Sequence, residues 1–568
     1  MSDSRFSDRK RLGERAMNGR RLAAIQIATI ALIAALALPA QSLAAPAKES
    51  FPTGFMWGTA SSGFQSEMGG GSANSDPNTD WWQWVRDPAQ IASKHVSGDL
   101  PENGPGAWQE NYATDIALAT SLGLNSWRMG IEWSRIFPNS TASVSIGSSV
   151  TTANLNALNA LADQTAVNKY RSILIAARAA KLKPFVTLSH FTLPLWIHDP
   201  SAVRAAFGSR GTDSAIPTGM TKAGWLAGST VTEFRKYAAY LAWKFGDLVD
   251  WWTPINEPMV QAVGAYANVP NAYASWFPPG LYSYRAALTA VTNMDYANAA
   301  AYDEIHHYDS RDSDSDGKKS RVGLVQNMIH FTPASASKSI DTAATVHADK
   351  LFNRTFPDAA IKGQYDLNAN GKVDAGEYKP SLAGKADFLG VNYYFRGRVS
   401  GLGASLSKTI PLLDFLPRTG YRWALNRTAP LCPTTCSEFG AELDSAGLEA
   451  VLTEAASYKL PLIVTENGIA DASDSRRSAF LVQHLNRAWK VTKSKPSGVS
   501  LLGWFHWSLT DNFEWSAGYL PKFGLYSFSP TTLARTARPS AALVGAIAKS
   551  NSLSSSQLSR WLTSPQSR

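Results

Sequence analysis

Two glutamates of this sequence each close a run that has the pattern of a β-strand. Glu466 ends the run Pro461-Leu-Ile-Val-Thr, and Glu257 ends the run Asp250-Trp-Trp-Thr-Pro-Ile-Asn256. Continuous apolar runs are typical of strands that are buried on both faces, as in a parallel sheet. A carboxylate at the end of such a strand is costly unless it has a partner or a chemical task. One glutamate alone would most simply form a salt bridge, but two at strand ends supply the nucleophile and the acid/base that hydrolyse a glycosidic bond.

The residues around both glutamates resemble the motifs of glycoside hydrolase family one, and most closely its archaeal-type branch of β-glucosidases and β-galactosidases. Val464-Thr465-Glu466-Asn467-Gly468 resembles the nucleophile motif, and Thr253-Pro254-Ile255-Asn256-Glu257-Pro258 resembles the acid/base motif. The resemblance extends from about Phe51 to about Ala546. It implies that Glu466 is the nucleophile and Glu257 the acid/base of a retaining enzyme.

The same resemblance assigns roles to residues that follow other strand-like runs. Arg128 would lie beside the nucleophile and hold it ionised, and Tyr394 would donate a hydrogen bond to it. Phe191 departs from the tryptophan that is more common in the family, so it keeps an aromatic face and loses the indole donor. The residues that the resemblance places around the bound sugar are Gln65, His190, Phe191, Asn256, Asn392, Trp507, Glu514 and Trp515.

The catalytic residues belong to a series of strand-like runs that alternate with helical stretches. Periodicity defines six strands, and the resemblance raises the number to eight. Without a Pro- or Ser-rich linker in residues 45–568, this alternation predicts an α/β fold in which one (β/α)8 TIM barrel forms a single catalytic domain. Such barrels build their sites at the C-terminal ends of the strands. The predicted strands are 55–63, 126–133, 183–190, 250–257, 321–328, 386–394, 461–469 and 501–509.

A separate group of residues has the spacing of a calcium-binding loop. Residues 366–377 match the twelve-residue EF-hand pattern, including a glycine at the sixth position. The run 312–317, Asp-Ser-Asp-Ser-Asp-Gly, repeats only its first half. Both runs precede predicted strands, so we expect a structural cation away from the catalytic face, with ordinary acidic surface turns as the alternative. The predicted ligands are Asp366, Asn368, Asn370, Lys372 through its backbone carbonyl, Asp374 and Glu377.

The first 44 residues have the composition of an export signal. Residues 1–21 carry seven basic and three acidic side chains, residues 22–40 are almost entirely apolar, and Ser42-Leu43-Ala44 are small or apolar. This order predicts a signal peptide over residues 1–44 and an exported protein, periplasmic or secreted. An uncleaved anchor is the alternative, because the apolar run approaches the length of a membrane span.

If the protein is exported, its two cysteines are expected to form a disulfide, and loss of the signal peptide changes its net charge. Cys432 and Cys436 are the only cysteines of the chain, and an isolated pair in an exported protein favours a disulfide. Removing the signal lowers the formal charge from +9 by four, seven basic minus three acidic side chains, to about +5. Because only 17% of the residues are charged, this excess gives no reason to expect a nucleic-acid partner.

These patterns together predict an exported retaining exo-β-glycosidase. Its expected substrates are β-linked oligosaccharides or aryl and alkyl β-glycosides with a terminal β-D-glucosyl group, and also β-D-galactosides and fucosides. Catalysis by two glutamates needs no organic cofactor or catalytic metal. Two alternatives are a sugar-binding barrel without catalysis and a 6-phospho-β-glycosidase of the same family. Glu514 argues against the latter, because its carboxylate would repel a phosphate. The oligomeric state is left open.

Overall fold

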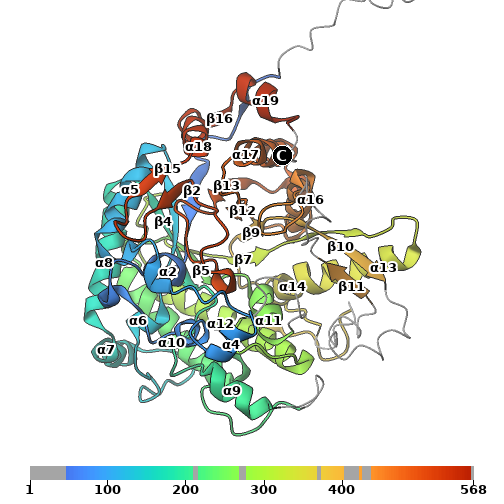
Figure 1. Cartoon of the computed structure of the whole chain (residues 1–568). Helices are drawn as coiled ribbons and strands as arrows, with labels where there is room; N and C mark the ends of the chain where they lie inside the picture. Colours follow the sequence, from blue (N-terminus) through green and yellow to red (C-terminus); the bar gives the residue numbers. More distant parts are fainter. Residues whose placement is uncertain are drawn as a thin grey trace, which may run out of the picture. The chain divides into compact units, whose positions relative to one another are not determined.

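The computed structural model describes residues 46–208, 215–267, 277–366, 372–401, 421–424 and 436–564. The residues predicted to be catalytic fall in one compact unit over residues 47–568. Its centre is a sheet of parallel strands (Figure 1). The strands are β2 (Met56–Ala60), β3 (Ser126–Gly130), β4 (Lys183–Ser189), β5 (Trp251–Ile255), β6 (Arg321–Val322), β7 (Leu324–Asn327), β9 (Leu389–Tyr393), β12 (Leu462–Asn467) and β13 (Leu501–His506).

The sheet closes on itself through its fifth strand. Its order is β6-β5-β4-β3-β2-β13-β12-β9-β7. The two ends of this order, β6 and β7, are consecutive parts of one strand, separated only by Gly323. The first part pairs with β5 and the second with β9. Nine segments therefore occupy eight positions, and the prediction of a single (β/α)8 barrel is confirmed.

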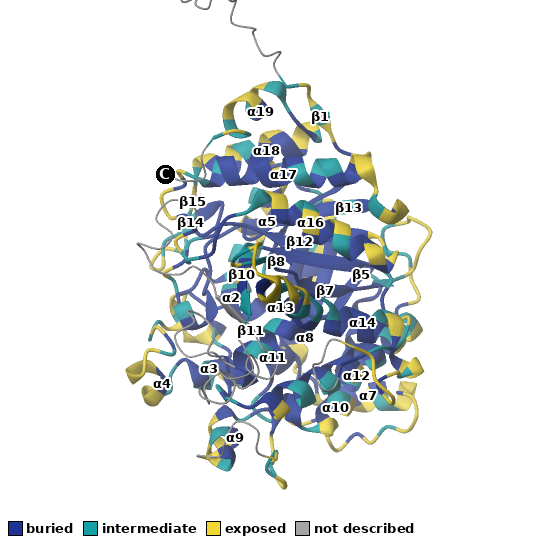
Figure 2. Ribbon diagram, turned by 90° about the vertical axis from the view of Figure 1, so that its right-hand side faces the viewer, coloured by how far each residue is buried: buried dark blue, intermediate teal, exposed yellow. Residues whose placement is uncertain are grey.

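Helices connect successive strands and pack around the barrel, as the right-handed parallel connection requires. Their inward faces are buried and their outer faces exposed (Figure 2). The main connecting helices, one after each strand position, are α5 (Tyr112–Ser121), α8 (Gln164–Ala179), α10 (Gly228–Phe245), α12 (Tyr284–Tyr308), α14 (Thr355–Lys362), α16 (Ser445–Ala455), α17 (Arg477–Ser494) and α18 (Pro539–Ser550).

Shorter elements fill the loops between strands and helices. The additional helices are α2 (Gly63–Ser66), α3 (Asp80–Trp84), α4 (Pro88–Ala92), α6 (Trp133–Ile136), α7 (Thr152–Leu161), α9 (Pro200–Phe207), α11 (Pro258–Tyr266), α13 (Ser339–Asp349) and α19 (Ser555–Trp561). The additional strands form one three-stranded sheet of β8 (His330–Pro333), β10 (Arg396–Gly401) and β11 (Tyr421–Ala424), and two pairs, β1 (Glu49–Ser50) with β16 (Ser552–Leu553) and β14 (Tyr526–Phe528) with β15 (Arg535–Ala537).

Aromatic side chains fill the interior of the barrel below the site. The rings of Phe185 on β4 and Phe505 on β13 are 5.9 Å apart, although these strands are not neighbours, so they meet across the barrel. Phe388 contacts Phe185 with a centroid distance of 5.4 Å. Glycines make room for these rings, because a Cβ atom at Gly58 or Gly323 would lie 2.4 Å from Phe505 or Phe388. The packed interior gives the strand ends a rigid base.

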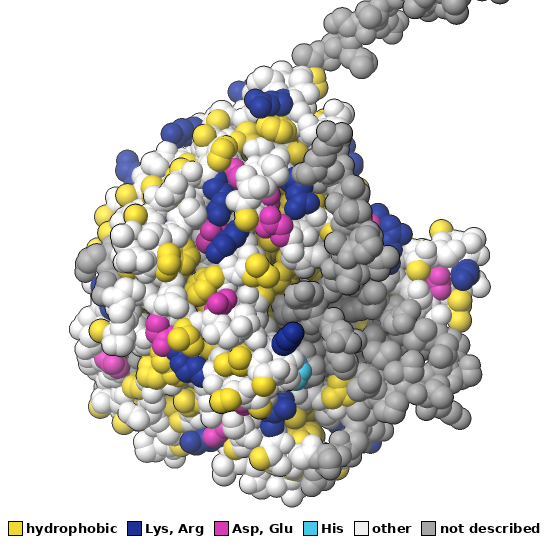
Figure 3. Space-filling view, in the orientation of Figure 1, with side chains coloured by type: hydrophobic (Ala, Val, Ile, Leu, Met, Phe, Trp, Pro, Cys, Tyr) yellow, Lys and Arg dark blue, Asp and Glu magenta, His cyan; other side chains and the backbone are white. Residues whose placement is uncertain are grey.

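The surface carries mixed charge, and the described helices are not of membrane-spanning type. On the face shown in Figure 3, basic and acidic side chains are interspersed among the described residues. Across the parts of the chain that the structure describes, each helix is too short or too polar to cross a bilayer. The predicted signal peptide, residues 1–44, lies outside the described residues.

Candidate active site

The C-terminal ends of the strands bring Glu257 and Glu466 into one buried cluster. Glu466 lies within β12, where it is in register with Asn392 of β9. Asn392 is in turn in register with Asn327 of β7, and Glu257 follows β5 by two residues. Asn256, which follows β5, pairs with Val325 of β7 where the barrel closes. Residues that are far apart in the sequence therefore share one layer at the mouth of the barrel. Both glutamates are at least nine-tenths buried, with 6% of Glu257 and 3% of Glu466 exposed.

Glu466 is held by a cation on one side and a hydroxyl group on the other. Arg128, which is fully buried on β3, forms an ion pair with its Oε1 atom. The hydroxyl of Tyr394 donates to Oε2 at 2.6 Å. Burial, followed by the charge of Glu466, raises the pKa of Tyr394 well above its usual value, so the phenol keeps its proton. Each carboxyl oxygen of Glu466 therefore has a donor, and the two contacts fix the orientation of the side chain.

Glu257 has partners that are amides rather than cations. Asn392 donates to its Oε1 atom at 2.6 Å, and Asn327 donates to the same atom at 3.4 Å. Burial, with the charge of Glu466 as the next cause, raises the pKa of Glu257 to about 8. Its backbone has φ = +46°, a left-handed conformation that is costly outside glycine and that concentrates at functional sites. At neutral pH, the carboxyl group of Glu257 is therefore largely protonated.

Arg128 also organises the amide and the imidazole near the glutamates. Its Nη2 atom donates to Asn256 Oδ1 at 2.6 Å, and Asn256 Nδ2 lies 3.2 Å from His190 Nε2. Burial and the positive charge of Arg128 lower the pKa of His190 well below its usual value. His190 is therefore a neutral hydrogen-bonding group, with a single ring proton whose position its partners decide.

A third carboxyl group, Glu514, lies in the loop that follows the eighth strand, β13. Glu514 Oε1 accepts from the indole of Trp507 at 3.0 Å, and Oε2 accepts from Gln65 at 3.4 Å. Burial raises the pKa of Glu514 to about 8, and the charge of Glu466 acts in the same direction. Gln65 comes from α2, after the first strand, so this group joins the first and last strands of the barrel.

Aromatic rings pack around His190. Trp507 stacks on it at 5.8 Å with an interplanar angle of 24°, and Trp515 does so at 5.9 Å and 16°. The ring of Phe191 lies edge-on to Trp515, with a centroid distance of 5.2 Å. The structure thus brings all of the predicted catalytic and sugar-site residues to one end of the barrel, in a buried and largely aromatic setting.

Three residues of this cluster were missed in the sequence. Asn327 reaches Glu257, as described above. The hydroxyl of Thr465 donates to Asn392 Oδ1 at 2.7 Å, and Gln65 donates to Asn512 Oδ1 at 2.9 Å. Asn327 could have been found as a polar residue at the end of the fifth predicted strand. Thr465 and Asn512 carry no comparable signal, because their partners come from distant strands.

The predicted calcium loop is only partly covered by the described residues. Asp366, Lys372, Asp374 and Glu377 are described, whereas Asn368 and Asn370 lie outside the described residues. At the ends of the loop, Asp366 and Glu377 are each 4% exposed. The Oε2 atom of Glu377 accepts from the backbone amide of Asp374 at 2.7 Å. Calcium binding by residues 366–377 stays a prediction.

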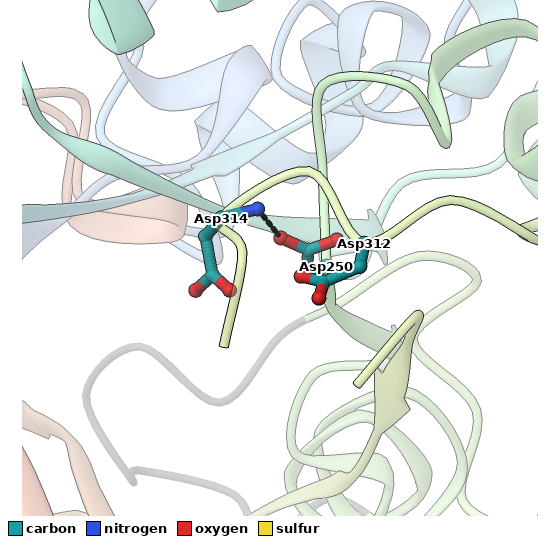
Figure 4. A group of neighbouring side chains, drawn as sticks. All are labelled: Asp250, Asp312 and Asp314. Atoms are coloured by element: carbon teal, nitrogen blue, oxygen red, sulfur yellow. Dashed lines mark hydrogen bonds between the residues drawn. The ribbon is translucent and has the colours of Figure 1, made fainter. Parts of the chain in front are cut away.

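The half-loop 312–317 contributes to an acidic cluster beside β5 (Figure 4). Carboxylate oxygens of Asp250, Asp312 and Asp314 lie within 4.8 Å of one another. Protein donors already serve this cluster. Asp250 accepts from the amide and hydroxyl of Ser313 and from the amide of Asp314, and Asp314 forms an ion pair with Lys183 at 2.9 Å. The Oδ1 atom of Asp314 is buried and has no hydrogen-bond partner among the described residues.

The predicted disulfide lies at the edge of the described part of the chain. Cys436 is buried and is disulfide-bonded rather than a free thiol. Cys432 lies outside the described residues, so its pairing with Cys436 stays a prediction.

Comparison with known proteins gives consistent matches over most of the chain. A family model described as "Glycosyl hydrolase family 1" matches residues 47–203 and 215–553. The chain is 38% identical over 506 residues to a β-galactosidase of Pyrococcus woesei, covering 86% of this chain and 94% of that protein. It is 26% identical to β-glucosidase A of Thermotoga maritima, over 89% of this chain and 99% of that protein. The solved β-glycosidase of Thermosphaera aggregans matches with a TM-score of 0.73 at 35% identity, covering 88% of this chain and 97% of that chain.

Proposed function

Because this chain belongs to glycosyl hydrolase family 1, we propose that it is an exported exo-β-glycosidase that removes terminal β-D-glucosyl and β-D-galactosyl groups. The observation that carries the proposal is the contrast between the two glutamates. Glu466 has a cationic partner, Arg128, whereas Glu257 has amide partners and a pKa raised by burial. Two carboxyl groups with different protonation states in one site are what a double displacement requires.

In the first step, Glu466 attacks the anomeric carbon while Glu257 protonates the glycosidic oxygen. The bond between sugar and aglycone breaks as the bond between sugar and Glu466 forms. Arg128 and Tyr394 keep the attacking carboxylate oriented. Esterification of Glu466 removes its negative charge, so the pKa of Glu257 falls after this step, because that charge is one of the causes that raise it.

In the second step, Glu257 acts as a base. The lower pKa lets it take a proton from a water molecule, which attacks the anomeric carbon and releases the sugar from Glu466. Glu257 returns to its protonated form, and Glu466 returns to its ionised form. Two inversions give net retention of the β configuration.

The site at the end of the eighth strand supports a neutral, unphosphorylated sugar. Glu514, Gln65 and Trp507 present a carboxyl group, an amide and an indole near one another, a set that suits hydroxyl groups. An additional phosphate on the sugar would meet the carboxyl group of Glu514. The relatives named β-galactosidase and β-glucosidase support both hexoses as substrates.

Three further proposals concern the chain outside the catalytic site. We propose export from the composition of residues 1–44, a structural calcium ion at residues 366–377, and a disulfide between Cys432 and Cys436. N-terminal sequencing of the mature protein, a calcium titration and mass spectrometry without reduction test them in turn. A mature N-terminus at Met1 and quantitative alkylation of both cysteines in the native protein would contradict the first and third.

A panel of nitrophenyl glycosides tests the proposed activity. We expect the purified enzyme to hydrolyse β-glucoside and β-galactoside, with β-fucoside as a further substrate, and not the α-anomers or the 6-phosphorylated β-glycosides. Proton NMR of the first product should show the β-anomer. A protein that binds sugars without turnover would fit the non-catalytic alternative, and a preference for 6-phosphorylated substrates would overturn the assignment of Glu514.

A further inference from the structure

Glu132 is a buried carboxyl group to which the proposed mechanism gives no role. It follows strand β3 by two residues and is 3% exposed. Its Oε1 atom accepts from the backbone amide of Phe64 at 2.8 Å, and its Oε2 atom accepts from the hydroxyl of Thr192 at 2.6 Å. Both oxygens are therefore used, and a fully bonded buried group of this kind fixes the relative placement of its partners.

Each partner of Glu132 lies next to a residue of the proposed sugar site. Phe64 immediately precedes Gln65 in α2, after the first strand. Thr192 follows His190 and Phe191, after the third strand. The side chain of Glu132, which follows the second strand, therefore links the segment after the first strand to the segment after the third strand.

Both segments have local features that require support. Phe191 has φ = +73°, a left-handed conformation that a bulky residue keeps only when its surroundings impose it. The bond from Glu132 holds the next residue, Thr192, in place. On the other side, Glu132 packs so closely on α2 that a Cβ atom at Gly63 would lie 2.6 Å from its Cγ and Oε1 atoms.

We propose that Glu132 is a positioning residue, which sets the spacing between Gln65 and His190 for the terminal sugar without touching the sugar itself. The inference rests on the proposed function, because it takes Gln65 and His190 to be sugar-binding residues. Loss of the link should weaken recognition of the sugar ring. It should affect the proton transfer by Glu257 less, because no bond of Glu132 reaches that residue.

The link depends on hydrogen bonds and not on a negative charge. Burial, followed by the charge of Glu67, raises the pKa of Glu132 to about 8, so its carboxyl group is largely protonated at neutral pH. A glutamine has the same shape, and its amide offers an oxygen to Phe64 and an NH2 group to Thr192, whose hydroxyl can accept as well as donate. Glu132→Gln should therefore keep the link, whereas Glu132→Ala removes it.

The test compares four variants of the full mature enzyme. Glu132→Ala and Thr192→Val break the link, Glu132→Gln preserves it, and Thr141→Val is a matched control. Thr141 is also buried and also donates to a glutamate, Glu233 on helix α10, which is not at a strand end. The readouts are KM and kcat for nitrophenyl β-glucoside and the inhibition constant of gluconolactone, which carries the sugar ring without an aglycone.

We expect the two link-breaking variants to raise KM and the inhibition constant by about tenfold, the effect of losing about one buried hydrogen bond. The Gln variant and the Thr141→Val control should stay within about twofold of the wild type. Melting curves verify folding, and Thr192→Val, which removes only a hydroxyl, answers the question if Glu132→Ala does not fold.

Three results would decide against the inference. They are unchanged inhibition in a folded Thr192→Val variant, a Gln variant as impaired as the Ala variant, and an equal loss in the Thr141→Val control. A wild-type enzyme that hydrolyses no β-glycoside would instead refute the proposed function, so the two failures can be told apart.

Discussion

The side-chain amide of Asn392 donates to Oε1 of Glu257 across 2.6 Å, from a strand that is separated from Glu257 by more than a hundred residues of sequence. Asn392 Oδ1 is itself held by the hydroxyl of Thr465, the residue before Glu466. One asparagine therefore connects the strand of the proposed acid/base with the strand of the proposed nucleophile. Its position explains how two glutamates from distant strands are held in a fixed geometry.

Replacing the two glutamates should separate their roles. Glu466→Gly should abolish hydrolysis, and added azide should then attack from the vacated face of the sugar and give an α-glycosyl azide. Glu257→Ala should slow the enzyme most for substrates with poor leaving groups, and azide should give the β-glycosyl azide. Proton NMR of the isolated azides identifies the anomers. The reverse pattern of anomers would exchange the two assignments, and an α-anomer as first product of the wild type would exclude retention.

The rate should fall in alkaline solution because Glu257 must be protonated to donate. Its pKa of about 8 predicts that kcat/KM for a nitrophenyl β-glucoside declines as the pH rises through about 8. A dinitrophenyl glucoside is the control, because its leaving group departs without a proton. Its kcat/KM should lack the alkaline decline. An identical decline for both substrates would mean that another group, or loss of the fold, limits the rate.

Glu514 should contribute to recognition of the sugar ring. Glu514→Ala removes the acceptor of the Trp507 indole and one of the acceptors of Gln65, which keeps its bonds to Asn512 and to the carbonyl of Phe513. Loss of such bonds should lower kcat/KM for β-glucoside by about 10- to 100-fold. Glu514→Gln should be less affected, because the native side chain is largely protonated at neutral pH. Unchanged kinetics in the Ala variant would place the sugar elsewhere.

Calcium should act on stability and not on catalysis. If residues 366–377 bind calcium only in the native state, a hundredfold excess over the dissociation constant adds about 2.7 kcal/mol to the free energy of unfolding. A chelator should lower the melting temperature, while initial rates at low temperature persist. Glu377→Gln should mimic the chelator, and Asp312→Asn serves as the control in the half-loop. Metal-free protein whose melting curve does not respond to calcium would refute the site.

The order and number of the barrel strands could be read from the sequence, with the help of the family resemblance. Each strand is a short apolar run that ends in polar residues, and burial on both faces makes such runs nearly continuous. The fifth strand differs in one detail, because Gly323 divides it into β6 and β7. The glycine is explained by the ring of Phe388, which occupies the space where a Cβ atom would lie.

The sequence by itself determined which residues stand at the strand ends, since hydrophobic runs and motif residues are local properties of the chain. It therefore identified Glu257, Glu466 and the residues around them. Only the tertiary structure decided which of these residues meet, because closure of the barrel between β5 and β7 brings distant strand ends into one layer. The link through Glu132, the contact of Asn327 with Glu257 and the raised pKa of Glu257 all depend on that layer. Burial and hydrogen bonding across strands create them, and neither is encoded in any single segment.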